Sequence, residues 1–421
     1  MRGTCKATIA ALLLATAVVA GCGAQSLPPH ANSWLSYKYS RSCDHCTELT
    51  DTVEAINYYC AIGVDPAGCA KTPPDPHLTL TDWFFPYFFT GSVGELPPPN
   101  AIYANLGDLR IGRDMYCYEA RTDSGRGLPL GSLACFVSNF GPAPFDPALN
   151  KTNCLWAACD GNGQPFYNFP KLNEAILQGT EYYNRHPFAS VGMTFTPGPG
   201  GAISPNAVKF YTFDSDGNLL LAPALDGEGP KTTPRMCMAC HGGTYDSTTH
   251  SVLGGSFLPF DVYYFQYGKG TTGDYLHIPA PSLDDQQEPF RQLNALVKTT
   301  NPTPAIVTVL DGMYPDGIEN ANSIAVDGFV PSGWSGHETL YNSVVRQYCR
   351  TCHLASGVDF GSFQKFKNAA VNIERLVCET HDMPHAEVPT AMFWRDTLAL
   401  NDLRDFLKSQ GMTGADLHDC Q

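Results

Sequence analysis

Short hydrophobic runs broken by turn residues, with few helical signals, mark the first half of the chain. Up to about position 230, runs of β-branched and aromatic residues are brief and are separated by Gly, Pro, Asn and Asp. This pattern is typical of strands joined by turns. Residues 207–213 are one such run, residues 214–218 (Asp-Ser-Asp-Gly-Asn) predict a turn, and residues 219–222 predict the return strand. We therefore expect a β-rich N-terminal domain over residues 33–230.

The second half of the chain has its apolar residues at helical spacing. Residues 282–299 and 303–310 predict two helices, the latter with a proline close to its start. Residues 335–348 predict an amphipathic helix that runs straight into Cys349. Residues 390–409 predict a further long helix near the C-terminus.

Two pentapeptides of the form Cys-x-x-Cys-His stand out from this pattern. They are residues 237–241 (Cys-Met-Ala-Cys-His) and residues 349–353 (Cys-Arg-Thr-Cys-His). This is the attachment signature of c-type haem, in which two thiols add to the vinyl groups of one porphyrin and the adjoining histidine binds the iron. A disulfide, or half of a zinc site with a histidine nearby, is the alternative interpretation. Two copies of the motif, in a chain whose N-terminus also predicts export, favour haem.

The chain thus resembles a dihaem c-type cytochrome with two covalently bound haem c groups. The resemblance assigns the four motif cysteines to thioether bonds and the two motif histidines to iron: Cys237, Cys240, Cys349, Cys352, His241 and His353.

Residues 333–421 also resemble a class I cytochrome c domain. The order of elements is the same: a helix, the haem motif, a loop with Met383-Pro384, and a C-terminal helix. The resemblance implies that Met383 is the distal iron ligand, which would raise the reduction potential relative to bis-histidine ligation. Because the interval from His353 to Met383 is shorter than in many members, three other side chains stay open as ligands: Met392, His381 and His385.

The first haem segment, residues 231–332, contains no counterpart to Met383. Residues 227–234 are rich in glycine and proline, so we expect the first motif to lie on a loop. The sixth ligand of this haem is left open among several methionines and histidines, and a five-coordinate site is a further alternative; the candidates are Met115, His186, Met193, His250, His277 and Met313.

The predicted fold class is therefore α+β. It combines a β-rich, disulfide-containing N-terminal region, a loop-borne first haem segment and an α-helical, class-I-like cytochrome c domain at the C-terminus. The arrangement resembles that of uncharacterised dihaem lipoproteins of bacteria, a family resemblance that implies no particular reaction.

The N-terminus predicts export. Arg2 and Lys6 precede a short apolar run over residues 9–20, which is too short to span a bilayer. The run ends in Val-Val-Ala-Gly-Cys at residues 18–22, which resembles the bacterial lipobox. An ordinary signal peptide, cleaved after a small residue, is the alternative.

The lipobox resemblance implies that residues 1–21 are a signal peptide and that Cys22 becomes lipidated. Residues 22–32 would then be a tether. By the same resemblance, Gly23 implies retention at the outer membrane. The expected location is the bacterial cell envelope, lipid-anchored, on the periplasmic or surface-facing side.

The cysteine count agrees with an oxidising compartment. The chain has 16 cysteines, and ten remain after Cys5, Cys22 and the four motif cysteines are set aside. An even remainder implies up to five disulfides. The ten are Cys43, Cys46, Cys60, Cys69, Cys117, Cys135, Cys154, Cys159, Cys378 and Cys420.

Sequence proximity suggests the pairs Cys117–Cys135 and Cys154–Cys159, while a Cys378–Cys420 bridge would hold the C-terminus. Residues 43–46 form another Cys-x-x-Cys pair, but Thr47 stands where a haem-binding histidine would be, so we interpret these cysteines as disulfide-forming.

Charge limits the classes of partner. The formal net charge is −15, which argues against nucleic acid and favours redox partner proteins with a basic or mixed-charge surface. Contact with a membrane is expected only through the lipid anchor.

Three functional classes compete. Electron transfer is favoured, so the protein is expected to be a carrier rather than an enzyme. The alternative is a dihaem peroxidase-like protein or another haem oxidoreductase with an open first haem, and a haem-based sensor is third.

Overall fold

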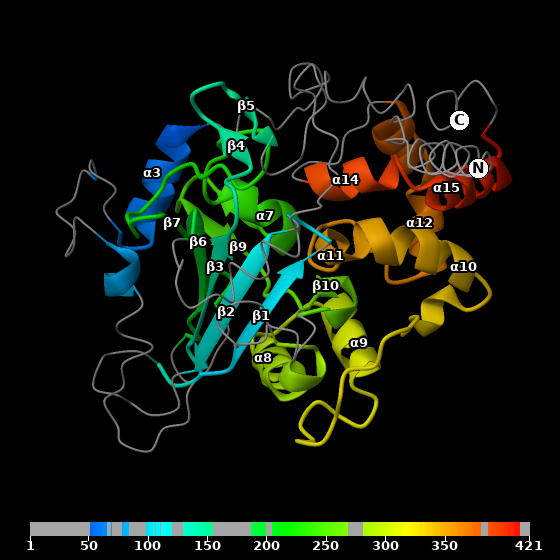
Figure 1. Ribbon diagram of the computed structural model, residues 1–421, viewed down its shortest axis with the longest axis horizontal. Helices are drawn as coiled ribbons and strands as arrows, with labels where there is room; N and C mark the ends of the chain where they lie inside the picture. The colour runs from blue at the N-terminus through cyan, green and yellow to red at the C-terminus, as the bar shows by residue number, and fades with distance from the viewer. Residues whose placement is uncertain are drawn as a thin grey trace, which may run out of the picture.

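The structure is a computed structural model (Figure 1) that describes eleven stretches of the chain: 51–64, 69, 78–83, 98–105, 107–109, 111–119, 129–154, 187–198, 204–267, 281–379 and 386–412. The predicted signal peptide, tether and lipidation site lie outside these residues, as do Cys43, Cys46 and Met383. Over the described stretches the fold is α+β, as the sequence predicts, with the sheet on one side and the C-terminal helices on the other (Figure 1).

A six-stranded antiparallel sheet forms the N-terminal part, in the order β10-β1-β2-β3-β6-β7. Its strands are β1 Asn100–Asn105, β2 Gly112–Glu119, β3 Leu133–Phe140, β6 Ala189–Phe195, β7 Val208–Asp214 and β10 Phe265–Gln266. Two small hairpins accompany it, β4 Phe145–Asp146 with β5 Lys151–Thr152, and β8 Thr244–Asp246 with β9 Ser251–Leu253. Strand β10 follows the first Cys-x-x-Cys-His motif in sequence, so the sheet is completed by chain from beyond residue 230.

The predicted turn after β7 forms, but the return strand over residues 219–222 is wrong. The Asp214 carboxylate accepts hydrogen bonds from the N–H groups of Asp216 (2.9 Å) and Asn218 (2.8 Å). Beyond the turn, the pairing continues through an isolated bridge between Phe213 and Leu219 and a hydrogen bond from the Leu220 N–H to the Thr212 carbonyl (2.8 Å), without forming a strand. Farther along β7, the Phe210 N–H and carbonyl bond the Tyr58 hydroxyl (2.7 and 3.3 Å), so helix α3 (Thr52–Ala61) takes the place of a return strand at this edge.

Helices surround the sheet and make up the C-terminal part. In chain order they are α3 Thr52–Ala61, α7 Arg235–His241, η3 Val262–Tyr264, η4 Asp284–Gln286, α8 Gln287–Thr299, α9 Pro304–Met313, η5 Ser332–Trp334, α10 Glu338–Leu340, η6 Tyr341–Cys349, α11 Arg350–His353, α12 Phe363–Asn368, α13 Ala370–Ile373, η7 Glu374–Glu379, α14 Glu387–Phe393 and α15 Thr397–Ser409. Helices α8 and α9 confirm two predictions, and Thr303 caps α9 through a bond from the Ile306 N–H (3.3 Å) with Pro304 at the first position.

The other two helix predictions differ in detail. The helix expected over residues 335–348 begins at Glu338 and continues to His353, with η6 wound as a π-helix. The single helix expected over residues 390–409 is wrong, because the chain forms α14 and α15 instead. The Asp396 carboxylate accepts bonds from the N–H groups of Leu398 (3.0 Å) and Ala399 (3.2 Å) and so begins a new helix.

The buried apolar side chains form two clusters. The first cluster runs from Tyr58 on α3 to Leu354 after the second motif and includes the sheet, Cys237 and helices α8 and α9. The second includes Trp334, which is fully buried, and is formed mainly by the helices from η5 onward, together with Ile111 before β2. The β-rich region and the first haem segment therefore share one core, and the C-terminal helices have their own.

Disulfides crosslink the N-terminal part. The predicted Cys117–Cys135 bridge is confirmed, and it joins residues directly opposite each other in β2 and β3. A Cys60–Cys69 bridge was not among the predicted pairs. Cys154 and Cys378 are each disulfide-bonded, while the partners predicted for them, Cys159 and Cys420, lie outside the described residues. Within the described stretches, no helix has the length and apolarity needed to cross a bilayer.

Candidate haem site

Both Cys-x-x-Cys-His motifs are helical. The prediction that the first motif lies on a loop is wrong, because residues 235–241 form helix α7. Pro234 stands immediately before the first turn, where a missing N–H costs no helical hydrogen bond, and Gly242 ends the helix with φ of 66°. The second motif occupies the end of η6 and the whole of α11, where the continuous helix from Glu338 ends.

The two motif histidines make the same hydrogen bond. His241 Nδ1 lies 2.9 Å from the carbonyl oxygen of Ser256, and His353 Nδ1 lies 2.8 Å from that of Val358. A carbonyl only accepts, so each Nδ1 carries the proton and each Nε2 keeps a lone pair. Burial lowers the pKa of both rings, which favours the neutral imidazole. A neutral ring with its Nδ1–H held by a carbonyl is the usual form of a metal-binding histidine.

A cavity of about 240 Å³ adjoins the first motif. Cys237, Cys240 and His241 line it on one side, and the inner face of the sheet lines it on the other. Two candidates for the sixth ligand, Met115 on β2 and Met193 on β6, are in this lining. The sequence did not single out Met236, which lines the same cavity.

The remaining described candidates lie elsewhere. His250 sits in the turn between β8 and β9, where its Nδ1 is 3.1 Å from the Tyr245 hydroxyl. Met313 is buried in the first core on α9. His186 and His277 lie outside the described residues.

The first cavity also contains a charged pair. Arg113 donates to Asp108 (2.6 Å) and to the side-chain oxygen of Asn139 (3.3 Å), and all three residues line the cavity. Burial on its own would lower the pKa of Arg113, but the adjacent Asp108 carboxylate outweighs it and the net pKa is raised. The first cavity is thus mainly apolar, with the Arg113–Asp108 pair and the Asp226 carboxylate, itself paired with Lys231, in its lining.

A larger cavity of about 460 Å³ adjoins the second motif. It is lined by Cys349, Cys352 and His353, and by apolar side chains of η6, η7, α14 and α15. Phe360 stacks on the His353 ring at 4.3 Å between centroids. Val377 and Ala386, which lie on either side of the segment that carries His381, Met383 and His385, both line this cavity. Met392 packs against the second core.

The motif thiols are unbonded and buried or partly buried. Burial raises the pKa of Cys237 and of Cys349 to about 12. A hydrogen bond with Cys240, together with burial, raises the pKa of Cys352 well above its ordinary value. The thiols of Cys237, Cys349 and Cys352 are therefore protonated at neutral pH and are poor nucleophiles.

The two cysteines of each motif line that motif's own cavity. One cysteine of the first motif contacts one cysteine of the second through its sulfur. Cys240 Sγ and Cys352 Sγ are 3.1 Å apart, and helices α7 and α11 lie side by side between the sheet and the C-terminal helices (Figure 1). No cluster of three or more His, Cys, Asp or Glu side chains suited to a metal ion occurs in the described stretches. Two cysteines, an oriented histidine and an adjoining cavity are present at each motif, and these residues fit covalent attachment and axial ligation of haem.

An ion pair made by Arg350, a residue of the second motif, holds the two hydrophobic cores together. Arg350 donates to the Asp261 carboxylate (2.5 Å) and to the Tyr341 hydroxyl (2.8 Å). The side chains of Arg350 and Asp261 are only 5% and 8% exposed, so the pair is buried between the two cores. The sequence identified the motif but gave no sign that its second residue pairs with Asp261.

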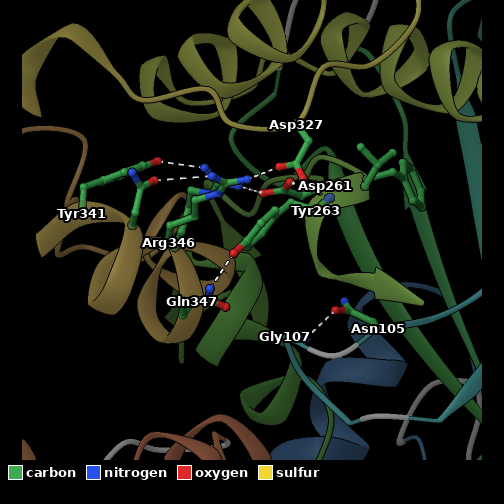
Figure 2. Close-up of polar contacts among 12 residues, drawn as sticks. Asn105, Gly107, Asp261, Tyr263, Asp327, Tyr341, Arg346 and Gln347 are labelled. Carbon is green, nitrogen blue, oxygen red and sulfur yellow. Dashed lines mark hydrogen bonds and ion pairs between the residues drawn. The ribbon is translucent and has the colours of Figure 1, made fainter. Parts of the chain in front are cut away.

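A second set of contacts extends this interface along the same helix (Figure 2). Arg346 pairs with Asp327 and lies over the Tyr263 ring, 3.4 Å from its centroid. Gln347 donates to the Tyr263 hydroxyl at 2.5 Å. The helix that carries the second motif is therefore fixed to η3, which follows the first motif in the chain.

Comparisons of the chain with protein-family models, curated proteins and solved structures found no match.

Proposed function

We propose that the protein is an electron-transfer dihaem c-type cytochrome of the bacterial cell envelope. The observation that carries the proposal is the repetition of one constellation. Each motif presents two unbonded cysteines and a neutral histidine held through Nδ1 by a backbone carbonyl, at the wall of its own cavity. The haems would supply a reversible one-electron change at iron.

In this proposal the chain's own residues do four things. Cys237 and Cys240 hold the first haem, Cys349 and Cys352 the second, and His241 and His353 bind the irons through Nε2. The apolar cavity walls exclude water, which favours a stable coordination over exchange with solvent. Ser256 and Val358 fix the ring orientations through their carbonyls.

The distal ligands are part of the proposal. We assign Met383 to the second haem, because the segment that contains it is flanked by two residues of the second cavity, Val377 and Ala386. That assignment goes with a class-I-like cytochrome c domain over residues 333–421. For the first haem, the thioethers of Met115 and Met193 in the first cavity favour a closed, six-coordinate site.

The location and partners of the protein follow from sequence resemblance and charge. Lipidation at Cys22 would anchor it, with the outer membrane as the expected site. A net charge of −15 favours redox partner proteins with a basic or mixed-charge surface.

Haem stoichiometry tests this proposal. The protein, produced with its own signal peptide in a bacterium able to attach c-type haem, is expected to keep its haem through acid–acetone extraction. A pyridine haemochrome assay is expected to return about two haems per chain, one for each motif. A haem-free protein in which Cys240 and Cys352 form a disulfide would contradict the proposal.

One observation favours the alternative, a peroxidase-like oxidoreductase. The Arg113–Asp108 pair lies in the first cavity, and a fixed cation beside a vacant iron position is suited to polarising bound oxygen species. The two functions differ in the coordination of the first haem, since a carrier needs six protein-supplied ligands and an oxidoreductase needs an open position.

Carbon monoxide distinguishes these two functions. We expect the fully reduced protein to show little change in its Soret band when carbon monoxide is added, because methionine occupies the sixth position. A large change that corresponds to one haem, together with turnover of hydrogen peroxide by the half-reduced protein, would overturn the electron-carrier assignment in favour of the oxidoreductase.

A further inference from the structure

We propose that the two motifs form a single paired unit, in which Cys240 touches Cys352 and each motif supplies part of the other's cavity, so that the two haems are directly coupled. This inference rests on the proposed function. It adds that the two redox centres exchange electrons through the contact between Cys240 and Cys352 and that the charge on one changes the potential of the other.

The sulfur contact is the first observation. Cys240 and Cys352 are the second cysteines of their motifs, and their sulfurs lie 3.1 Å apart although 112 positions separate them in the chain. In a loaded protein each of these sulfurs is bonded directly to a side chain of its own haem. Contact between the sulfurs therefore gives the shortest covalent route from one porphyrin to the other a single non-bonded step.

The second observation is reciprocal lining. Thr351, inside the second motif, lines the cavity of the first motif. Ala239, inside the first motif, lines the cavity of the second. Each cavity therefore includes a residue that belongs to the other attachment sequence, which two independent haem domains would not require.

The third observation is the close approach of the two backbones. Gly242 follows directly after His241, and a Cβ at this position would lie 2.0 Å from the carbonyl oxygen of Ala355. A Cβ on Gly107, in the connection from β1 to β2, would lie 2.9 Å from the Thr351 hydroxyl. Both motifs are thus packed against each other and against the sheet at positions where only glycine fits.

Polar contacts, in addition to close packing, hold the two motifs in place. Arg350 inside the second motif pairs with Asp261, and the Thr303 hydroxyl donates to the carbonyl of Leu354 at 2.6 Å. These bonds join the second motif to segments that follow the first motif in sequence. The relative position of the motifs is therefore fixed by the fold rather than by a flexible linker.

Coupling follows from this placement. Charges separated by protein interact more strongly than charges separated by water, because the protein has the lower dielectric constant. One haem is reduced before the other. The charge of the electron that it takes up makes addition of an electron to the other haem less favourable. Porphyrins attached to two touching sulfurs would also lie close enough to couple their optical transitions, which would give a bisignate circular dichroism signal in the Soret region.

The test compares two glycine substitutions. Gly242→Ala places a methyl group against the backbone of Ala355, so it is expected to separate the motifs and to abolish or strongly reduce the bisignate Soret signal. Gly254→Ala is the matched control, because Gly254 also has a positive φ, of 77°, but a Cβ there would have no neighbour within 4 Å. The control is expected to keep the wild-type signal, and both variants are expected to keep two haems.

The outcomes separate this inference from the proposed function. A wild-type protein with two haems whose Soret dichroism equals the sum of its two single-haem variants would overturn the pairing and leave electron transfer standing. An unchanged bisignate signal in a folded Gly242→Ala variant would also contradict the pairing, since that variant carries a methyl group where the two motifs meet. A wild-type protein without haem would overturn the proposed function itself.

The inference stays testable even where Gly242→Ala fails to fold. A single-haem protein, obtained by changing Cys349 and Cys352 to alanine, has no second porphyrin and is expected to give a signal of one sign. A bisignate signal in that variant would contradict the pairing. Potentiometric titration of the wild-type protein is expected to show two steps, and the first haem is expected to shift in potential when the second haem is removed.

Discussion

Changing Cys349 and Cys352 together to alanine is expected to halve the haem content and leave the first haem in place. Without either thiol, no thioether bond forms at the second motif, and His353 alone is too weak an anchor to keep a haem through acid–acetone extraction. The first motif keeps both thiols and its own cavity. The pyridine haemochrome assay on purified protein, per mole of chain, measures the result.

The reciprocal variant, with Cys237 and Cys240 changed to alanine, is expected to lose the other haem. A variant that loses two cysteines outside the motifs is the matched control. Changing Cys60 and Cys69 to alanine removes a disulfide near α3, which is expected to cost stability by about 2–4 kcal/mol but no haem. A motif variant that keeps both haems would show that attachment does not use these thiols.

Changing Asp261 to asparagine is expected to destabilise the protein by about 3–5 kcal/mol, since it leaves the Arg350 guanidinium buried without its counter-charge. Arg350 is 5% exposed on its side chain, and Asp261 is the carboxylate that it pairs with at 2.5 Å. Asparagine keeps the shape of the side chain, so the loss reports charge rather than a cavity. Urea unfolding of the haem-loaded protein, followed by far-ultraviolet circular dichroism, measures the shift in midpoint.

The control for this change is an ion pair of similar length in solvent. Lys298 and Asp311 are 2.7 Å apart, with side chains 36% and 56% exposed, so Asp311→Asn is expected to cost no more than about 1 kcal/mol. Equal effects of the two substitutions would mean that the Arg350–Asp261 pair does not hold the two cores together. Loss of stability at Asp261 with unchanged haem content is the expected pattern.

Several elements could be predicted because their signals are local. Thr303 followed by Pro304 is a helix start that needs no tertiary information, and α9 begins there. Asp396 caps α15 by the same chemistry, and its position within a long apolar pattern concealed the break between α14 and α15. The strand lost after β7 shows the reverse case: residues 219–222 are an apolar run, but the next free edge groups of β7, the Phe210 N–H and carbonyl, bond the Tyr58 hydroxyl instead.

By itself the sequence determined the chemistry available at each motif. Two thiols and a histidine at fixed spacing are a local property, and the short interval between Cys117 and Cys135 was enough to suggest their disulfide. Only the tertiary structure decided that Cys240 meets Cys352, that Arg350 pairs with Asp261, and that the carbonyls of Ser256 and Val358 orient the histidines. These contacts depend on burial and on backbone position. A carbonyl is the same at every residue, and the partner of a buried charge is set by the packing of segments far apart in the chain.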